Sequence, residues 1–410
     1  MIDHRKIGFY PAQVLIPKVD DMTKWSVVAC DQYTSQPEYW ARVRDFVGEA
    51  PSTLKMILPE AELETADPES VNNTMKEYLE KDLFDTHNYT FVYLQRTQND
   101  GKVRQGLIGM LDLECYDYHK GSQTLCRATE GTVEDRLPPR IRVRKDAPLE
   151  LPHIMVLIDD PECTVIEFLQ NKTCCFEQLY DFDLMEQGGH LTGHAIKGVE
   201  CEDRMKALAA LAGDQEHPLL YAMGDGNHSL ATAKACYEQL KETLGDAALE
   251  HPARYCLVEL VNLHSDALQF EPIHRIVANT DPDRLMDVLK EAGLEEGGAH
   301  PQQIEIVRNG EHTVYSFAKE TSKLAVGSLQ NALDRLVPQI GGEIDYIHGE
   351  EVVDDLSRKE GSIGFILPNM AKEDLFPTVI ADGALPRKTF SMGHAHDKRF
   401  YLECRRITKE

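Results

Sequence analysis

The segment Leu219-Leu-Tyr-Ala-Met-Gly-Asp-Gly-Asn-His-Ser-Leu-Ala-Thr-Ala-Lys234 decides the fold, because its pattern changes from strand to helix within a few residues. Residues 219–223 are apolar and predict a buried strand, whereas the apolar residues of 229–244 recur with a helical period. Between them, Gly224 and Gly226 permit positive φ and allow a ligand to approach the backbone closely. The segment therefore predicts a strand–turn–helix junction.

The rest of the chain alternates between the same two patterns. Short apolar runs predict strands at 25–30, 90–94, 107–113, 154–158, 255–263, 314–317 and 363–367. Helical periodicity predicts helices at 38–47, 71–83, 203–212, 282–291, 329–337 and 349–358. Strands and helices interleaved in this way predict an α/β or mixed α+β architecture.

The length of 410 residues predicts two or three domains. The best boundary is GDAALEHP at 245–252, which closes a long helix before a new strand. We therefore expect one domain over 1–246 and a second, α/β domain over 250–410. The irregular stretch EEGGAHPQQ at 295–303 is predicted to be a loop inside the second domain.

The charge balance limits the classes of ligand. The chain has 43 Lys and Arg against 69 Asp and Glu, a net charge of −26, so nucleic acid and acidic membrane surfaces are disfavoured as partners. A small anion can still bind where basic side chains gather. The most basic stretch, 130–151, is interpreted either as a solvated loop that balances nearby acids or as a positive wall around an anionic ligand.

Targeting and thiol chemistry give few further signals. No apolar stretch is long enough for a signal peptide or a membrane span, which predicts a cytoplasmic protein without membrane partners. The ten cysteines are then expected to be reduced and mostly buried, and no CxxC spacing suggests zinc. A homodimer is the commonest oligomer for such a protein, but no segment identifies an interface.

The junction at 224–229 has the chemistry of an anion site. The N–H groups of a first helical turn and the helix dipole stabilise negative charge. At that place Asp225 can bind a metal or a hydroxyl, and His228 can donate to phosphate or transfer a proton. The alternative is a capped turn in which Asp225 and Asn227 satisfy the backbone. The segment lacks the Gly-Lys-Ser/Thr ending of a Walker A loop.

Six segments in order resemble domain-of-unknown-function family 1015, a bacterial family with a DGHHR-type box. GDGNHSLATAKA at 224–235 is similar to that box, and Asp31 in WSVVACDQYTSQPEYW at 25–40 occupies the Asp position of the N-terminal Pro-Tyr-Asp segment. The other similar segments are RATEGTVEDR at 127–136, FEPIHRIV at 270–277, IDYIHGEEVV at 344–353 and GALPRKTF at 383–390. The resemblance extends over essentially the whole chain.

The box also resembles that of the ParB/sulfiredoxin-like superfamily, whose members bind nucleotides at this junction. Some phosphorylate free serine with ADP or ATP, and others bind CTP as DNA-partition clamps. The resemblance implies a ParB/sulfiredoxin-like fold for 1–246, ATP or ADP with Mg²⁺ as cofactor, and a small anionic or hydroxylated metabolite as partner. Two positions depart from the box, because Asn227 replaces its first His and Ser229 replaces an Arg that faces phosphate.

The resemblance also implies roles for individual residues. Glu130, Asp225 and His228 are the expected catalytic residues, with Glu130 as base toward a substrate hydroxyl. The expected phosphate contacts are Gly224, Gly226, Asn227, Ser229, Arg136, Lys388 and Thr389, and the expected Mg²⁺ ligands are Asp225 and Asp31. Each has a plainer interpretation, since Glu130 and Arg136 can form a surface pair and the others can belong to turns.

The histidines outside the box have weaker patterns. His190 and His194 are spaced for a metal on a helix, but Gly188, Gly189 and Gly193 favour a loop or turn beside the ligand. His394 and His396 have the spacing to chelate a divalent ion. His274 and His348 follow strand-like segments and suit either a cleft or a structural role.

Three functions remain open at this point. The first is a phosphotransfer enzyme, with nucleotide-dependent phosphorylation of free L-serine as best guess and phosphoserine hydrolysis at the same site as its variant. The second is a non-catalytic, nucleotide-responsive regulator, which the net charge and the lack of a basic helix-turn-helix disfavour as a DNA-binding protein. The third is a metabolite-binding protein that has lost catalysis, which the replacements at Asn227 and Ser229 would explain.

Overall fold

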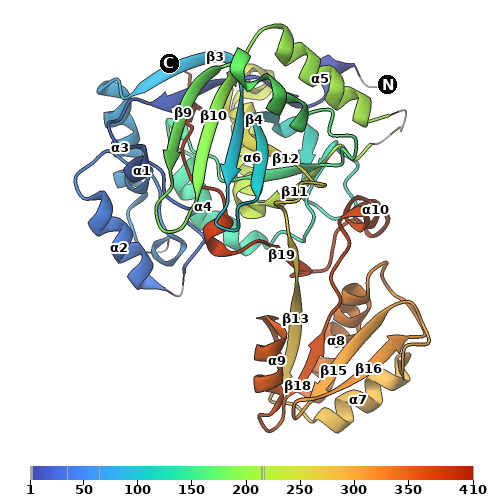
Figure 1. Cartoon of the computed structure of the whole chain (residues 1–410). Helices are drawn as coiled ribbons and strands as arrows, with labels where there is room; N and C mark the ends of the chain where they lie inside the picture. The colour runs from blue at the N-terminus through green and yellow to red at the C-terminus, as the bar shows by residue number, and fades with distance from the viewer. Residues whose placement is uncertain (1–2, 35, 64, 214–215, 217, 410) are drawn as a thin grey trace. The chain divides into compact units, whose positions relative to one another are not determined.

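The computed structural model describes residues 3–34, 36–63, 65–213, 216 and 218–409, and divides into two compact units. The first unit contains the chain up to Ala128, Thr132–Leu268 and the segment from His394 onward; the second contains Thr129–Gly131 and Gln269–Gly393 (Figure 1). The predicted division at 246–250 therefore differs from the observed one. The reason is β12 (Tyr255–Asn262), which pairs with β4 and β8 in the sheet of the first unit.

The first unit is built on one mixed sheet with the strand order β5–β6–β11–β8–β12–β4–β3–β10–β9; β1 pairs with β4, and β2 with β3. Its strands besides β12 are β1 (Phe9–Tyr10), β2 (Ala12–Pro17), β3 (Phe84–Thr97), β4 (Val103–Asp112), β5 (Tyr116–Asp117), β6 (Cys126–Arg127), β8 (Met155–Ile158), β9 (Glu177–Asp183), β10 (His190–Ile196) and β11 (Tyr221–Asp225). The short strands β7 (Leu149–Glu150) and β20 (Arg405–Arg406) pair separately. This pairing attaches the C-terminal segment to the first unit.

Two hydrophobic clusters cover the two faces of this sheet. Alternate residues of β3 enter different clusters, since Val92 and Leu94 belong to the first and Phe91 and Tyr93 to the second. The helices besides α6 (Asn227–Leu244) are α1 (Met22–Trp25), α2 (Pro37–Val47), α3 (Pro68–Glu80), α4 (Leu137–Arg144) and α5 (Val199–Leu211). Residues of α1 to α3 pack into the first cluster, and residues of α5 and α6 into the second.

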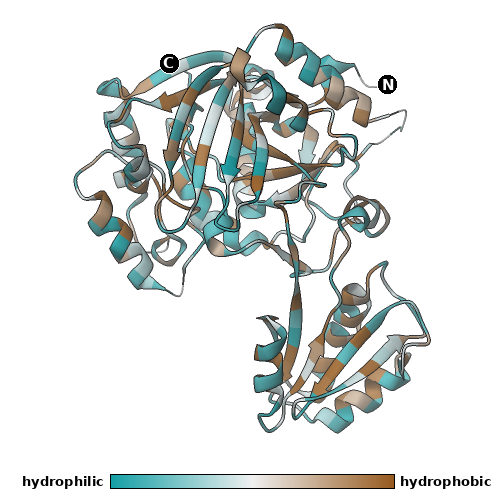
Figure 2. Cartoon of the chain, viewed as in Figure 1, coloured by the Kyte–Doolittle hydropathy of each residue, from teal (hydrophilic) through white to brown (hydrophobic). Residues whose placement is uncertain are grey.

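The second unit has its own antiparallel sheet and its own core. The strand order is β14–β16–β15–β18–β13–β17, with β19 beside β13. Its elements are β13 (Phe270–Ala278), α7 (Pro282–Glu291), β14 (Leu294–Glu296), β15 (Gln303–Arg308), β16 (Glu311–Phe317), α8 (Ala325–Ile340), β17 (Glu343–His348), α9 (Glu350–Ser357), β18 (Ile363–Ile366), α10 (Leu375–Asp382) and β19 (Phe390–Met392). Helices α7 and α8 pack in one cluster and α9 in another, so the sheet is covered on both faces. In Figure 2, α7 alternates between hydrophobic and hydrophilic residues, as expected for a helix on a sheet.

The mixed α/β class predicted from the sequence is confirmed, and three local predictions are wrong. Residues 25–30 do not form a strand, because α1 ends at Trp25 and Val28 makes only a single bridge with Phe400. The predicted loop at 188–194 is largely strand β10, paired with β3 and β9. The basic stretch 130–151 contains helix α4, with proline in its first turn.

No helix in the described part of the chain combines the length and the apolarity needed to cross a lipid bilayer. Four cysteines, Cys126, Cys201, Cys256 and Cys404, are buried as predicted. Cys163, Cys174 and Cys175 are exposed, contrary to the expectation that most cysteines are buried apolar residues.

Candidate functional site

The predicted strand–turn–helix junction is present in the first unit, where β11 leads into α6 (Figure 1). Gly226 caps the helix in the left-handed conformation with φ of 78°, and a Cβ there would lie 3.1 Å from Ile154. Gly224 lies within β11, where the pairing with β8 shifts register. Helix α6 begins at Asn227, two residues before the predicted start, so Asn227 and His228 supply the first N–H groups of the helix.

Asp225 is held at this junction by two contacts. One carboxylate oxygen accepts a hydrogen bond from the Gly226 N–H at 2.9 Å, and the other lies 3.3 Å from the Lys398 ammonium. The Lys398 side chain is only 12% exposed, so the pair is partly shielded from water. Lys398 was not predicted as a site residue, because it is far from Asp225 in sequence and its segment has no motif that indicates the contact.

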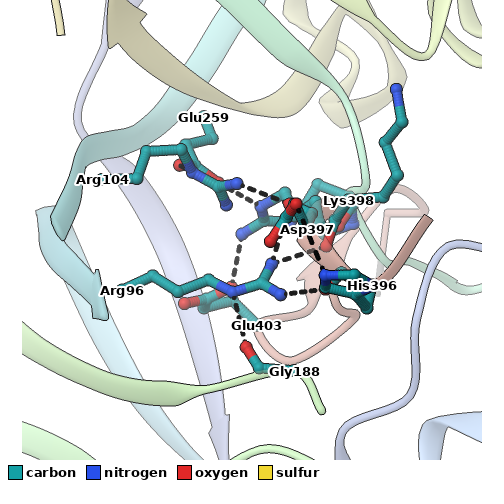
Figure 3. Close-up of polar contacts among 10 residues, drawn as sticks. Arg96, Arg104, Gly188, Glu259, His396, Asp397, Lys398 and Glu403 are labelled. Carbon is teal, nitrogen blue, oxygen red and sulfur yellow. Dashed lines mark hydrogen bonds and ion pairs between the residues drawn. The ribbon is translucent and has the colours of Figure 1, made fainter. Parts of the chain in front are cut away.

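A cluster of buried charges fixes the backbone that carries Lys398 (Figure 3). The Arg96 guanidinium donates to the carbonyls of His396, Asp397 and Lys398, and also to that of Gly188. Arg104 donates to the Asp397 carbonyl at 2.9 Å. With these carbonyls held, the Lys398 side chain extends away from the cluster.

Asp31 has the same lysine in its electrostatic surroundings. Burial of part of the carboxyl would raise the pKa of Asp31, but the nearby charges of His153 and Lys398 and a hydrogen bond from Gln32 hold it below its ordinary value. The Asp31 carboxyl is therefore ionised at neutral pH. The fold thus places Asp31 and Asp225, the two predicted metal ligands, around one lysine.

Asn227 and His228 each carry a buried polar atom in the first turn of α6. Among the described residues, Asn227 Oδ1 and His228 Nε2 have no hydrogen-bond partner. Burial lowers the pKa of His228, and the positive charges of Arg140 and Arg136 lower it further. The imidazole is therefore neutral at neutral pH. Such atoms at a helix N-terminus favour an interpretation as ligand contacts over that of a self-contained turn.

Ser229 belongs to a chain of hydrogen bonds that the sequence did not predict. Its hydroxyl lies 3.0 Å from His153 Nε2, and the Tyr401 hydroxyl lies 3.0 Å from His153 Nδ1. Tyr401 also accepts a hydrogen bond from the Cys30 N–H at 3.2 Å. Four distant parts of the sequence therefore meet at the first turn of α6.

The basic stretch contributes both structure and charge. Arg140 pairs with Glu60, and Arg144 pairs with Glu150, which supports the interpretation that these bases balance nearby acids. Arg140 and Arg136 also act on His228 electrostatically. Arg136 therefore lies close enough to the junction to act on His228, and its role as a phosphate contact stays a prediction.

The remaining predicted residues belong to the second unit. Glu130 forms a parallel bridge with Leu385, and its charge acts on the buried Arg275. The Thr389 hydroxyl donates to the Pro386 carbonyl at 2.6 Å, and Lys388 is exposed with a positive φ of 55°. Thr389 therefore serves the turn that contains it, and the roles of Glu130 and Lys388 stay predictions.

His190, His274 and His394 have structural partners, whereas the buried His194 Nδ1 has no hydrogen-bond partner among the described residues. His190 lies between Asp181 and Asp183 at 2.7 Å from each, and the hydrogen bond that the imidazole donates to Asp183 is the main reason that the pKa of His190 is raised. His274 is buried and accepts a hydrogen bond from the Leu367 N–H at 3.1 Å. The His394 side chain caps a short helical turn closed by Asp397. The described part of the chain contains no group of three or more His, Cys, Asp or Glu side chains that could hold a metal ion.

Fold and junction together define a mixed α/β protein with a polar site at the N-terminus of a helix. The chain belongs to the family described as "Protein of unknown function (DUF1015)", whose sequence profile matches residues 10–336. This confirms the family inferred from the sequence, and four of the six similar segments lie within the matched residues, whereas 344–353 and 383–390 lie beyond them. None of the curated proteins compared with the chain matches its sequence.

Solved structures with a related arrangement include free serine kinases. A free serine kinase variant in complex with AMP is 12% identical, with a TM-score of 0.41 over 73% of this chain and 92% of that chain. A variant in complex with ADP is also 12% identical, with a TM-score of 0.41 over 75% and 94% of the two chains. A conserved hypothetical protein from Pyrococcus furiosus is 10% identical, with a TM-score of 0.38 over 73% and 94%.

Proposed function

We propose that the junction at Gly224–Ser229 binds the phosphates of ATP or ADP and transfers one phosphoryl group to the hydroxyl of a small metabolite. Free L-serine is the first candidate acceptor, on the strength of the resemblance of the box. The observation that carries the proposal is the N-terminus of α6, whose N–H groups can donate to phosphate oxygens, together with two buried acceptors, Asn227 Oδ1 and His228 Nε2, that have no partner among the described residues and can accept from ligand hydroxyl groups.

The residues of the junction suit the charges of such a reaction. Lys398 and the N–H groups of α6 can stabilise phosphate oxygens, and Lys398 supplies a cation although the box lacks its arginine at Ser229. Neutral His228 can accept the proton of the attacking hydroxyl at Nε2. The hydroxyl oxygen forms a bond to phosphorus while the bridging P–O bond breaks, and the nucleotide leaves with one phosphate fewer.

Asp31 and Asp225 are the residues that would hold Mg²⁺. Both are carboxylates around Lys398, and Mg²⁺ in phosphoryl-transfer sites commonly takes one or two protein carboxylates, with phosphates and water completing its ligands. When bound, the ion neutralises charge on the phosphates. A pair of carboxylates is compatible with that mode of binding.

The test is to incubate the purified protein with L-serine, Mg²⁺ and either ATP or ADP, and to measure phosphoserine by mass spectrometry. Asp225→Ala and Lys398→Met should each lower the rate by roughly tenfold or more. Asp246→Ala, at an exposed carboxylate beyond the other end of α6, is the matched control and should keep the rate.

Three results would contradict parts of the proposal. Absence of product with any nucleotide and a range of hydroxylated acceptors would exclude phosphotransfer, and tight nucleotide binding without turnover would then indicate a binding protein. Phosphate release from phosphoserine without nucleotide would indicate the hydrolytic variant. Full activity of Asp225→Ala would exclude the junction as the site.

A further inference from the structure

A pocket of about 150 Å³ opens beside the first turn of α6 within the first unit. Ser229 and Thr232, one helical turn apart on α6, line one side of it. The rest of the lining is mostly aliphatic and includes Met56, Ile57, Leu63, Val143, Leu149 and Leu257. A volume of about 150 Å³ with such a lining is the size that admits one benzene ring.

The charged residues on the pocket wall are already neutralised. Arg140 and Arg144 reach the lining, but they pair with Glu60 and Glu150. The Thr232 hydroxyl donates to the His228 carbonyl at 2.6 Å within its own helix. A ligand that placed an ammonium or carboxylate group among the aliphatic side chains would lose its hydration without gaining a partner there.

One polar group on the wall can still serve a ligand. Within the described part of the chain the Ser229 hydroxyl has one side-chain hydrogen bond, to His153, so it keeps either its proton or a lone pair for the pocket. Burial raises the pKa of Tyr401 well above its ordinary value, so that hydroxyl stays protonated and can share its proton with His153 Nδ1. The two hydrogen bonds of His153, with Ser229 and with Tyr401, can form with the protons running in either direction. Ser229 can therefore donate to, or accept from, an alcohol.

We infer that this pocket selects the acceptor, and that it takes an alcohol whose hydroxyl meets Ser229 and whose apolar substituent, aromatic or branched aliphatic, fills the aliphatic lining. The inference rests on the proposed function in placing the alcohol at the phosphate-binding turn. The acceptor inferred here differs from free L-serine, because the aliphatic lining offers no partner for the ammonium and carboxylate groups of serine. Each added methylene that the pocket buries should strengthen binding about fourfold.

The test measures binding, without phosphotransfer, by ligand-observed NMR and calorimetry. The probes are benzyl alcohol, toluene, 3-methylbutanol, ethanol, L-serine and adenosine. Benzyl alcohol should bind at least tenfold more tightly than ethanol or L-serine. Ser229→Ala should weaken benzyl alcohol binding roughly two- to tenfold, the effect of one hydrogen bond, and leave toluene binding unchanged.

A second variant tests the pocket without touching its polar end. Ala147 lines the pocket, so Ala147→Leu should fill it and abolish binding of both benzyl alcohol and toluene. Ala209→Leu, at a buried alanine of α5 in the other cluster, is the matched control and should keep binding. The urea midpoint should fall for Ala209→Leu, because Ala209 is buried in a hydrophobic cluster, and not for Ala147→Leu, because the pocket accommodates the added atoms.

The outcomes separate this inference from the proposed function. Benzyl alcohol binding that Ala147→Leu removes, with no phosphoryl transfer from any nucleotide, would support the pocket and contradict the function. Phosphorylation of L-serine with no binding of apolar alcohols would support the function and overturn the inference. Adenosine binding that Ala147→Leu removes would also overturn it, because the pocket would then hold the nucleotide base.

Discussion

Two buried polar regions of the first unit differ in how completely they are paired. In the buried charge cluster around Glu259, both Arg104 and Arg399 contact Glu259, and Arg399 also contacts Glu403, with every one of these side chains at most 3% exposed. Figure 3 shows Arg104, Glu259 and Glu403 of this cluster. At the junction of β11 and α6, Asn227 Oδ1 and His228 Nε2 are buried without a partner among the described residues. We call the first the closed region, because its side chains pair with one another, and the second the open region, because the described residues leave two of its polar atoms unpaired.

The difference separates buried polar groups that are paired within the protein from those that we propose as ligand contacts. A buried charge is tolerated when its hydrogen bonds are satisfied, and the cluster uses its pairing to hold the carbonyls of 396–398. An unsatisfied buried atom costs free energy, so its retention at a helix N-terminus favours a site. Lys398 connects the two regions, because its backbone belongs to the first and its ammonium to the second.

The largest effect is expected when the closed region loses its central carboxylate. Burial would raise the pKa of Glu259, but Arg104 and Arg399 hold it below its ordinary value, so the carboxylate is ionised. Glu259→Ala removes the carboxylate that pairs with the two buried guanidiniums. The free energy of unfolding should therefore fall by about 3–5 kcal/mol, measured by urea denaturation. Lys81→Ala, in the exposed Lys81–Glu77 pair, is the control and should leave the urea midpoint unchanged. An equally small effect of Glu259→Ala would contradict the comparison.

A smaller effect is expected when the link between the regions is cut. Arg96→Gln removes donors to the carbonyls of 396–398 and should cost about 1.5–3 kcal/mol of stability. Hydrogen exchange should become faster in 394–398, and nucleotide binding should weaken because Lys398 is no longer held.

Arg42→Gln is the matched control for that experiment, since Arg42 is an exposed arginine paired with Glu186. It should change neither exchange in 394–398 nor nucleotide binding. Nucleotide binding that is as tight in Arg96→Gln as in the unmodified protein would show that Lys398 acts independently of the cluster.

The smallest effect concerns the pH dependence of the open region. The pKa of His228 lies below the ordinary value of 6.5, so the imidazole gains its proton only as the pH falls below that value. A bound anion favours the protonated form, and sulfate affinity should therefore rise roughly three- to tenfold between pH 7.5 and pH 5.5. Sulfate is the probe because its charge stays constant over this range, and calorimetry measures the affinity.

His228→Gln should remove most of that pH dependence. His312→Gln is the control, since His312 belongs to the second unit and lies between Glu305 and Asp354. The pKa of His312 is raised mainly by the hydrogen bond to Glu305. The His312→Gln substitution should leave the pH dependence of sulfate affinity unchanged. An unchanged profile in His228→Gln would remove His228 from the anion site.

Local patterns predicted the elements better than they predicted their partners. The run at 219–223 and the periodicity of 229–244 correspond to β11 and α6, because side-chain period and glycine conformation are local properties. Residues 25–30 have an equally apolar pattern but form no strand. There the Trp25 indole and the Ser26 hydroxyl donate to the carbonyls of Leu402 and Tyr401, contacts that no local pattern encodes.

The sequence by itself determined the mixed α/β class, the family and the turn that carries Asp225, Asn227 and His228. Only the tertiary structure decided that Lys398 faces Asp225, that His153 and Tyr401 lie behind Ser229, and that an aliphatic pocket adjoins them. The physical reason is the range of the interactions. Backbone preference and periodicity act over a few residues, whereas an ion pair or a pocket depends on which distant segments the sheet and its two cores bring together.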